Sequence, residues 1–150
     1  MTLYNKRMHH VLREALVPYT PQQMYALVND VANYSHFLSW CKSSRIVAQK
    51  DHELTATLVI AKAGLYKAFT TKNTLTPFER IDIDLVNGPF KHLTGHWKFT
   101  ENPQGCLVSV NLEFEFSSKI LEIMFGPVFH EVAHGLVHAF TQEAHRRYGN

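Results

Sequence analysis

The sequence CLVSVNLEFEF at residues 106–116 decides the fold class of this chain. From Cys106 to Phe116 every second side chain is apolar, and Asn111 and Glu113 are among the polar side chains between them. A period of two is typical of a β-strand that buries one face and exposes the other. The alternation begins near residue 43 and recurs in four upstream segments, at residues 54–60, 69–75, 81–85 and 92–99.

Short segments rich in glycine, proline and asparagine separate these strands. They occur at residues 62–64, 76–78, 87–89 and 102–105. Connections this short join neighbouring antiparallel strands. The six predicted strands therefore form an antiparallel meander with one face exposed to solvent.

The residues after the last strand have a helical period instead. Within residues 118–148 the apolar side chains fall in an arc of about 100° on a helical projection. We expect one long helix, capped by Ser117 or Ser118 and bent near Gly126 and Pro127, because proline lacks the N–H that the helical ladder needs. The arc consists of Leu121, Phe125, Val128, Phe129, Val132, Leu136 and Phe140.

The N-terminal part adds one more strand and two short helices. Residues 10–17 alternate weakly and contain β-branched side chains, which favours a strand. Thr20 followed by Pro21 has the pattern of an N-cap with proline at the first helical position, and it predicts a helix over residues 22–30. The aromatic-rich residues 34–40 predict a second short helix.

These elements together predict an α+β fold. A curved antiparallel sheet of about seven strands wraps round a long C-terminal helix, and two short helices follow the first strand. No linker or charge block divides the sequence, so we expect a single domain over residues 1–150. The large apolar side chains that face the helix suit either a packed core or an apolar ligand chamber.

The composition excludes several classes of protein. The chain is 45% hydrophobic and 12% aromatic with a formal net charge of +2, which excludes a disordered chain and does not by itself predict DNA as a partner. The N-terminus lacks the apolar core of a signal peptide. The longest apolar stretch, residues 121–129, is interrupted by Glu122 and Pro127 and is too short for a transmembrane helix. Cys41 and Cys106 are far apart, so we expect reduced thiols and a cytoplasmic protein.

Residues 130–134 read HEVAH, which matches the HExxH pattern of zinc proteases. On a helical projection His130, His134, His138 and His145 lie within about 80°, on the side away from the apolar arc. A catalytic zinc needs a third ligand and a cleft that excludes water. We therefore expect a solvated helix face without a metal. No GxSxG, P-loop or GxGxxG pattern occurs either, so we expect no enzymatic activity.

A set of short motifs extends over nearly the whole chain, from about residue 10 to residue 149. They include VPY at 17–19, QMY at 23–25, LVNDV at 27–31, FLSWC at 37–41, NGPFK at 87–91, WKF at 97–99, FEF at 114–116 and FGPVF at 125–129. As a set they resemble the coenzyme-Q-binding START-domain family, within the wider SRPBCC or Bet v 1-like group. The resemblance implies a helix-grip fold and a lipophilic ligand such as ubiquinone, held between the sheet and the C-terminal helix in support of respiration.

The resemblance implies no catalytic residues. The family keeps a glutamate at the position of Glu131 but does not require the histidines around it. For bacterial members it implies a second activity, in which the protein binds the large ribosomal subunit and blocks subunit joining.

The main hypothesis is that an apolar chamber binds a quinone-like ligand and that no cofactor is needed. Asn73 and Tyr66 are the candidate polar partners of the quinone head. The predicted ligand contacts are Phe37, Leu38, Trp40, Leu58, Ile60, Phe69, Leu85, Phe90, Trp97, Phe99, Leu112, Phe114, Phe129, Val132 and Leu136.

The alternative hypothesis is a translation inhibitor with a basic face for ribosomal RNA. Ile120, Ile123 and Met124 add apolar surface at the start of the long helix, where we expect a membrane or a partner to touch, so a peripheral position at the inner membrane is part of the prediction. The basic residues are Lys6, Arg7, Arg13, Lys42, Arg45, Lys62, Lys67, Lys72, Lys91 and Lys98.

Overall fold

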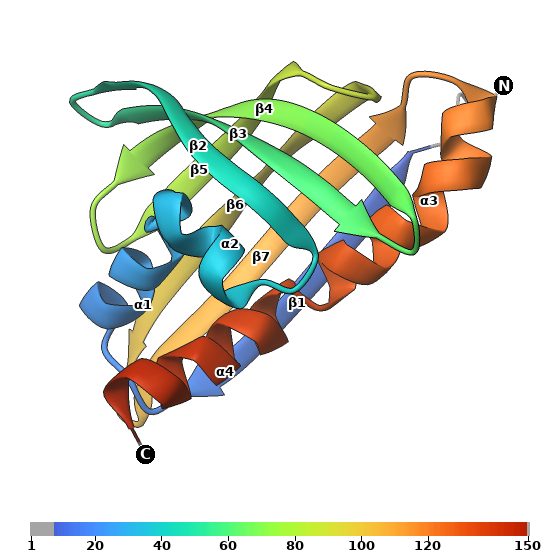
Figure 1. The fold of residues 1–150 in the computed structure, drawn as a ribbon. Helices are drawn as coiled ribbons and strands as arrows, with labels where there is room; N and C mark the ends of the chain where they lie inside the picture. The colour runs from blue at the N-terminus through green and yellow to red at the C-terminus, as the bar shows by residue number, and fades with distance from the viewer. Residues whose placement is uncertain (1–7, 150) are drawn as a thin grey trace, which may run out of the picture.

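The computed structural model describes residues 8–149, which form one antiparallel sheet and a set of helices on its concave side (Figure 1). The sheet has seven strands in the order β1-β7-β6-β5-β4-β3-β2 within the described residues. The strands are β1 (His9–Val17), β2 (Cys41–Lys50), β3 (Glu53–Lys62), β4 (Leu65–Thr76), β5 (Arg80–Asn87), β6 (Phe90–Asn102) and β7 (Gly105–Phe116). The helices are α1 (Pro21–Val28), the 3-10 turn η1 (Val31–Asn33), α2 (Tyr34–Phe37), α3 (Lys119–His134) and α4 (Leu136–Tyr148).

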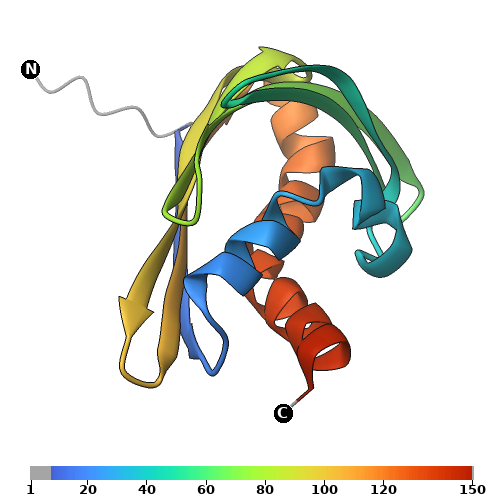
Figure 2. The same ribbon diagram turned by 90° about the vertical axis from the view of Figure 1, so that its left-hand side faces the viewer.

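The sheet arches over the two C-terminal helices, while α1, η1 and α2 cross its open side (Figure 2). Each strand pairs with its neighbour in the chain except β1, which closes the far edge against β7. The predicted α+β helix-grip architecture is confirmed, including the two short helical segments after the first strand.

Gly95 permits the close approach of β6 and β7 within this curved sheet. A Cβ atom at Gly95 would lie 2.2 Å from the carbonyl oxygen of Asn111 and 2.7 Å from a methyl carbon of Leu112. Glycine inside a strand is typical of such close backbone contacts.

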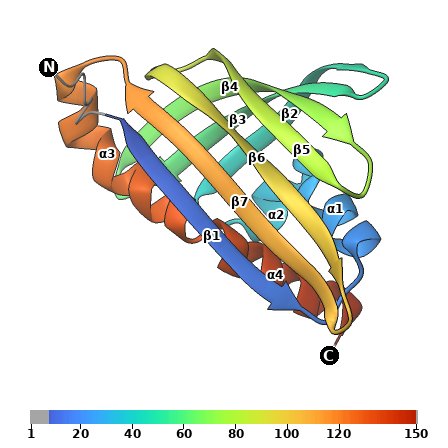
Figure 3. The ribbon, with the colours of Figure 1, turned by 180° about the vertical axis from the view of Figure 1, so that it is seen from behind.

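The C-terminal helix bends at a different residue from the one predicted. α3 continues through Pro127, and the chain turns by 44° at Gly135, between α3 and α4. The Gly135 N–H donates to the carbonyl oxygens of Glu131 and Val132 at 3.1 and 3.2 Å, so this glycine ends one helix while its own carbonyl accepts from Ala139. Pro127 is exposed on the solvent side of α3. The bend lets both helices run along β1 and β7 (Figure 3).

The predicted caps are present. The Thr20 hydroxyl accepts from the Gln23 N–H at 3.0 Å, and the Gln23 side chain accepts from the Thr20 N–H at 2.9 Å, which is a complete capping box with Pro21 at the first helical position. Ser118 caps α3 through the Leu121 N–H at 3.1 Å. These caps fix where the helices enter the concave face of the sheet.

Candidate ligand-binding cavity

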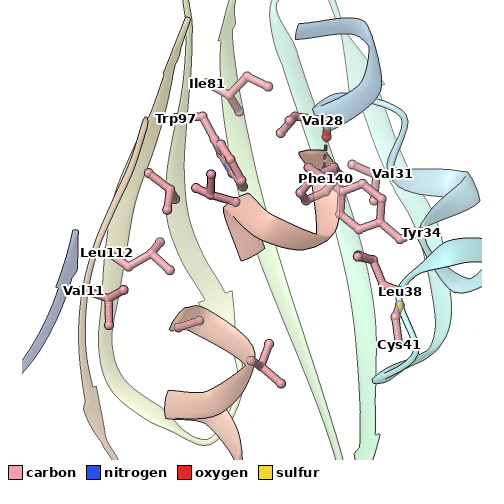
Figure 4. Close-up of a cluster of buried hydrophobic side chains, with 14 of the residues drawn as sticks. Val11, Val28, Val31, Tyr34, Leu38, Cys41, Ile81, Trp97, Leu112 and Phe140 are labelled. Carbon is pink, nitrogen blue, oxygen red and sulfur yellow. Dashed lines mark hydrogen bonds between the residues drawn. The ribbon is translucent and has the colours of Figure 1, made fainter. Parts of the chain in front are cut away.

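An apolar cavity of about 90 Å³ lies between the sheet and the helices. Its walls come from the inward faces of β3 to β7, from α3 and α4, and from the α1–α2 segment. In Figure 4, Trp97 and Ile81 of the sheet face Tyr34 and Phe140 of the helices. The volume is below that of an engineered cavity of about 150 Å³ that binds benzene. A larger ligand therefore requires the side chains around it to move.

Eight of the fifteen predicted contact residues line this cavity, and their role as ligand contacts remains a prediction. They come from the α2–β2 connection, from strands β3, β4, β6 and β7, and from α3 and α4. The eight are Trp40, Leu58, Phe69, Trp97, Leu112, Phe129, Val132 and Leu136.

The other seven predicted residues pack around the cavity without lining it. Leu38, Ile60 and Phe99 are buried in the core, and Phe37 and Leu85 are half-buried against it. Phe90 and Phe114 belong to a cluster of aromatic rings between the sheet and the first half of α3.

This phenylalanine cluster fills the space between the sheet and α3. The ring of Phe90 lies 4.9 Å from that of Phe129, 5.2 Å from that of Phe116 and 6.5 Å from that of Phe125, measured between centroids. The Phe90–Phe129 pair is edge-to-face and the Phe90–Phe116 pair is stacked, and both are favourable arrangements of aromatic rings. Phe129 has the cluster on one side and the cavity on the other.

Several lining residues were not among the predicted contacts. Val28, Val31 and Tyr34 of the N-terminal helices cover the cavity, which a period-two reading of the strands does not reveal. Ala56 and Ala133 line it from opposite sides and are 2% and 0% exposed. These small side chains leave the space that their larger neighbours enclose.

The cavity contains few polar atoms. The Thr71 hydroxyl donates to Oδ1 of Asn73 at 3.1 Å, and the Tyr34 hydroxyl donates to the carbonyl oxygen of Val28. Burial raises the pKa of Tyr34 far above its ordinary value, so this hydroxyl stays protonated. Of the two predicted polar partners, Asn73 lines the cavity, whereas Tyr66 is 60% exposed and does not.

Trp40, Leu58 and Leu136 mark the rim of the cavity. All three line it and are only half-buried, and they come from the α2–β2 connection, β3 and α4. Asn73 and Ile83 also line the cavity and are half-buried, so the place where the α2–β2 connection, β3 and α4 meet is one candidate opening.

A buried carboxylate on α4 orients two arginines of the same helix, and one of them links α4 to the N-terminal segment. Glu143 is 5% exposed and accepts hydrogen bonds from Arg146 at 2.5 and 2.9 Å and from Arg147 at 2.7 Å. Arg147 also pairs with Asp30 at 3.2 Å and covers the ring of Phe37 at 5.2 Å from its centroid. The bond from Arg146, with help from Arg147, holds the pKa of Glu143 below its ordinary value.

The HEVAH segment is not arranged as a metal site. Within residues 8–149 no group of three or more histidine, cysteine, aspartate or glutamate side chains is placed to hold a metal. His130 is half-buried rather than fully solvated, because its Nε2 lies 2.9 Å from Nδ1 of His9 and its ring packs on Phe114. Burial, and then the neighbouring His9 and His134, lower the pKa of His130. Glu131 points outward and pairs with Lys62 at 3.5 Å.

The predicted basic residues do not share one face. Arg13 lies on the helix side of the sheet, where it donates to His134 at 2.5 Å, whereas Lys98 faces outward between the inward-facing Trp97 and Phe99. Lys42 packs over the exposed ring of Tyr66 at 5.6 Å from its centroid. Lys6 and Arg7 are outside the described residues.

The predicted apolar tip of α3 is exposed. Ile120, Ile123 and Met124 are 69%, 64% and 59% exposed, and they lie on one face of the helix at spacings of three and four residues. Between residues 8 and 149 no single helix is long and apolar enough to cross a bilayer, and only the bent pair of α3 and α4 meets that criterion by length and composition.

A curved sheet that grips a C-terminal helix around an apolar cavity defines the class of helix-grip proteins. Over residues 17–141 the chain matches the family described as polyketide cyclase / dehydrase and lipid transport. The chain belongs to this family, and the resemblance inferred from the motifs is confirmed.

Three known proteins show how the chain relates to others. It is 46% identical over 142 residues to the ribosome association toxin RatA of Escherichia coli K12, covering 94% of this chain and 90% of that protein. It is 28% identical to the mitochondrial coenzyme Q-binding protein COQ10 of Drosophila melanogaster, covering 97% of this chain and 62% of that protein. The crystal structure of the Zhui aromatase/cyclase from Streptomyces sp. R1128 has the same fold, with a TM-score of 0.84 at 17% identity over 94% of this chain and 96% of that one.

Proposed function

We propose that the protein binds a lipophilic quinone-like molecule in the cavity and catalyses no reaction on it. The observation that carries this proposal is a cavity with largely apolar walls and a few polar side chains, among them the hydrogen-bonded pair Thr71 and Asn73. Such walls with a few placed polar atoms are typical of sites for apolar ligands. The similarity to a protein named coenzyme Q-binding supports the class of ligand.

The cavity walls also lack most of the usual catalytic groups, and the hydroxyl groups of Tyr34 and Thr71 donate to neighbouring protein oxygens. Among the described lining residues none carries a carboxylate, imidazole, thiol or amine. General acid–base and nucleophilic catalysis use these groups. This composition supports binding rather than chemistry.

The cavity is large enough for the head of a quinone but not for its isoprenoid tail. A space of about 90 Å³ suits the head once the surrounding side chains shift slightly, and it does not hold an isoprenoid tail. We infer that the tail leaves through the rim at Trp40, Leu58 and Leu136. Each methylene that the rim buries contributes about 0.8 kcal/mol, so a few isoprenoid carbons suffice for useful affinity.

Organic extraction of the purified protein followed by mass spectrometry tests this proposal. We expect a co-purifying quinone or related polyisoprenoid, and a titration with a short-tailed benzoquinone that saturates at one ligand per chain. Absence of both an extracted lipid and a saturable titration would refute it.

A second candidate function is association with the large ribosomal subunit, which would block subunit joining. The observation that favours it is the 46% identity, over nearly the whole chain, to proteins named ribosome association toxin. We infer that exposed cations contact ribosomal RNA phosphates, and the first residues to examine are Lys42, which packs over the exposed Tyr66, and Arg45, which is also exposed on β2.

Sedimentation with isolated large subunits at low and moderate salt tests this second function. We expect binding at low salt that weakens as salt rises, and loss of binding in a K42E/R45E double variant. A K119E variant is the control, since Lys119 is also exposed but lies on α3. No sedimentation of the wild type at low salt would remove this function.

We also infer that the apolar tip of α3 touches the inner membrane from the cytoplasmic side when ligand is exchanged. Ile120, Ile123 and Met124 supply the apolar contact, and Lys119 supplies a cation for anionic lipids. Flotation with vesicles of mixed anionic and neutral lipids tests it. An I120S/I123S/M124S variant should stay with the soluble fraction, and equal flotation of variant and wild type would contradict this role.

A further inference from the structure

Tyr66 lies on the outer face of the sheet, away from the cavity. It is 60% exposed, and it pairs with Ala61 of β3. Ile60, the neighbour of Ala61, is 0% exposed and belongs to the core, and successive side chains of a strand point to opposite faces of the sheet. Ala61 and Tyr66 therefore face away from the helices. A large aromatic ring in this position is accessible to a partner from solvent.

Lys42 lies directly beside this ring. Its Nζ atom is 5.6 Å from the centroid of the Tyr66 ring. The register of β2 against β3 shifts between Cys41 and Ser43, so Lys42 is the extra residue of a β-bulge. A bulge of this kind redirects a side chain relative to the regular strand. A cation and an exposed aromatic ring are thereby brought together at the edge of the sheet.

Arg45 lies on the same outer face, further along β2. It pairs with Thr57 of β3, whose neighbour Leu58 lines the cavity, so Thr57 and Arg45 face outward. The four residues from Thr57 to Ala61 extend about 13 Å along β3 at about 3.3 Å per residue. The rows of Arg45 and Tyr66 are therefore about 13 Å apart along the strands, which is the length of about four stacked nucleotides at about 3.4 Å each.

The part of the chain that carries this surface is basic. Residues 41–76, from the start of β2 to the end of β4, contain six lysine or arginine residues and two acidic residues, which is a net charge of +4. The whole chain has a formal net charge of +2, so its remaining residues are negative in sum. The three strands lie side by side at one edge of the sheet (Figure 1). This asymmetry of charge favours a polyanion as the partner of this edge.

We propose that Tyr66 stacks on an unpaired base of ribosomal RNA, while Lys42 and Arg45 contact the phosphates beside that base. This inference rests on the proposed association with the large ribosomal subunit and adds the form of RNA that is recognised. Exposed aromatic rings among cations bind single-stranded RNA, because the bases of a duplex are stacked on one another and do not reach such a ring. The stem of lysine is flexible, so the Lys42 ammonium can leave the ring for a phosphate when a base arrives.

Sedimentation with isolated large subunits, together with titration of a labelled single-stranded oligouridine, tests this inference. We expect the wild type to bind oligouridine more tightly than an RNA duplex of the same length. Tyr66→Ala should weaken the binding of both the subunit and oligouridine by about 5-fold or more, whereas Tyr66→Phe, which keeps the ring, should retain most of the affinity. Phe78→Ala is the matched control, because Phe78 is also an exposed aromatic residue, at 48%, but lies in the turn after β4.

The outcomes separate this inference from the function on which it rests. Unchanged sedimentation of Tyr66→Ala refutes the stacking and leaves ribosome association intact. A wild type that does not sediment with the subunit at low salt refutes both. Sedimentation that requires Tyr66 without any binding of oligouridine would place a ribosomal protein against the ring and overturn the inference, and so would equal affinity for oligouridine and the duplex. Because Tyr66 is mostly exposed, Tyr66→Ala should keep the thermal unfolding transition of the wild type.

Discussion

Filling the cavity with a larger side chain should abolish ligand binding without destabilising the fold. Ala133 on α3 lines the cavity and is 0% exposed. Ala133→Leu adds three carbons, which would occupy much of the roughly 90 Å³ of space. At about 0.8 kcal/mol for each buried carbon, the added contacts stabilise the folded state by about 2 kcal/mol if the void accepts them.

Ala144 supplies the matched control. It is also 0% exposed, on α4, but it does not line the cavity. Overpacking a site without a void costs about 1–3 kcal/mol. The same substitution should therefore differ between the two positions by about 3–5 kcal/mol in the free energy of unfolding.

Urea unfolding of both variants, followed by titration with a short-tailed benzoquinone, measures the two effects. We expect Ala133→Leu to be as stable as the wild type or more stable, and to have lost the ligand. Ala144→Leu should be less stable, with a melting temperature lower by about 2–4 °C for each kcal/mol, and should still bind. Equal destabilisation of the two variants would show that no usable void exists at Ala133, and undiminished binding by Ala133→Leu would place the ligand elsewhere.

Three further predictions concern the scaffold and its charged groups. Gly95→Ala should cost about 2 kcal/mol or more in urea unfolding, since its Cβ would lie 2.2 Å from the Asn111 carbonyl oxygen; wild-type stability would contradict the close strand contact. The hydrogen bond from Arg146 lowers the pKa of Glu143 from 4.5, so the stability it confers is present above pH 4.5 and is lost as the pH falls through the folded-state pKa. Glu143→Gln should lower the free energy of unfolding by about 1–3 kcal/mol at pH 7, and stability should then fall less steeply below pH 4.5. An unchanged dependence of stability on acid pH would count against this role of Glu143. Burial lowers the pKa of His130 from 6.5, so the stability that its neutral ring confers on the fold is present above pH 6.5 and is lost as the pH falls through the folded-state pKa. An NMR titration of His130 should give a pKa below 6.5, and a higher value would exclude the half-buried position.

The fold followed from the sequence because period and turn chemistry agree with it at every strand. The alternation from Cys106 to Phe116 predicts both the extent of β7 and which of its side chains are buried, and the capping box of Thr20 and Gln23 predicts the start of α1. The bend in the C-terminal helix was predicted at the wrong residue. Proline is the usual cause of a kink, but Pro127 lies on the exposed side of α3, where solvent can satisfy the backbone. The 44° turn occurs instead at Gly135, where one helix ends and the next begins.

The cavity was only partly predictable because period identifies the inward face and not the gaps on it. Phe90 and Phe129 both face inward, yet Phe90 packs within the aromatic cluster and Phe129 also borders open space. The gap arises where Ala56 on β3 and Ala133 on α3 face the same region, which depends on how distant elements meet. Tyr34 lies in the aromatic-rich segment that predicted only a short helix, and in the structure it is buried and lines the cavity.

Because successive side chains of a strand point to opposite faces of the sheet, the two proposed binding sites lie on different faces. Trp97, for example, lines the cavity while its neighbour Lys98 faces solvent. Ligand and ribosome would therefore contact different residues of the same strands. Ala133→Leu should remove quinone binding and leave sedimentation with the large subunit unchanged, whereas K42E/R45E should do the reverse. If each variant lost both activities, the two would share one site or be coupled through the sheet, and the assignment of one function to each face would be wrong.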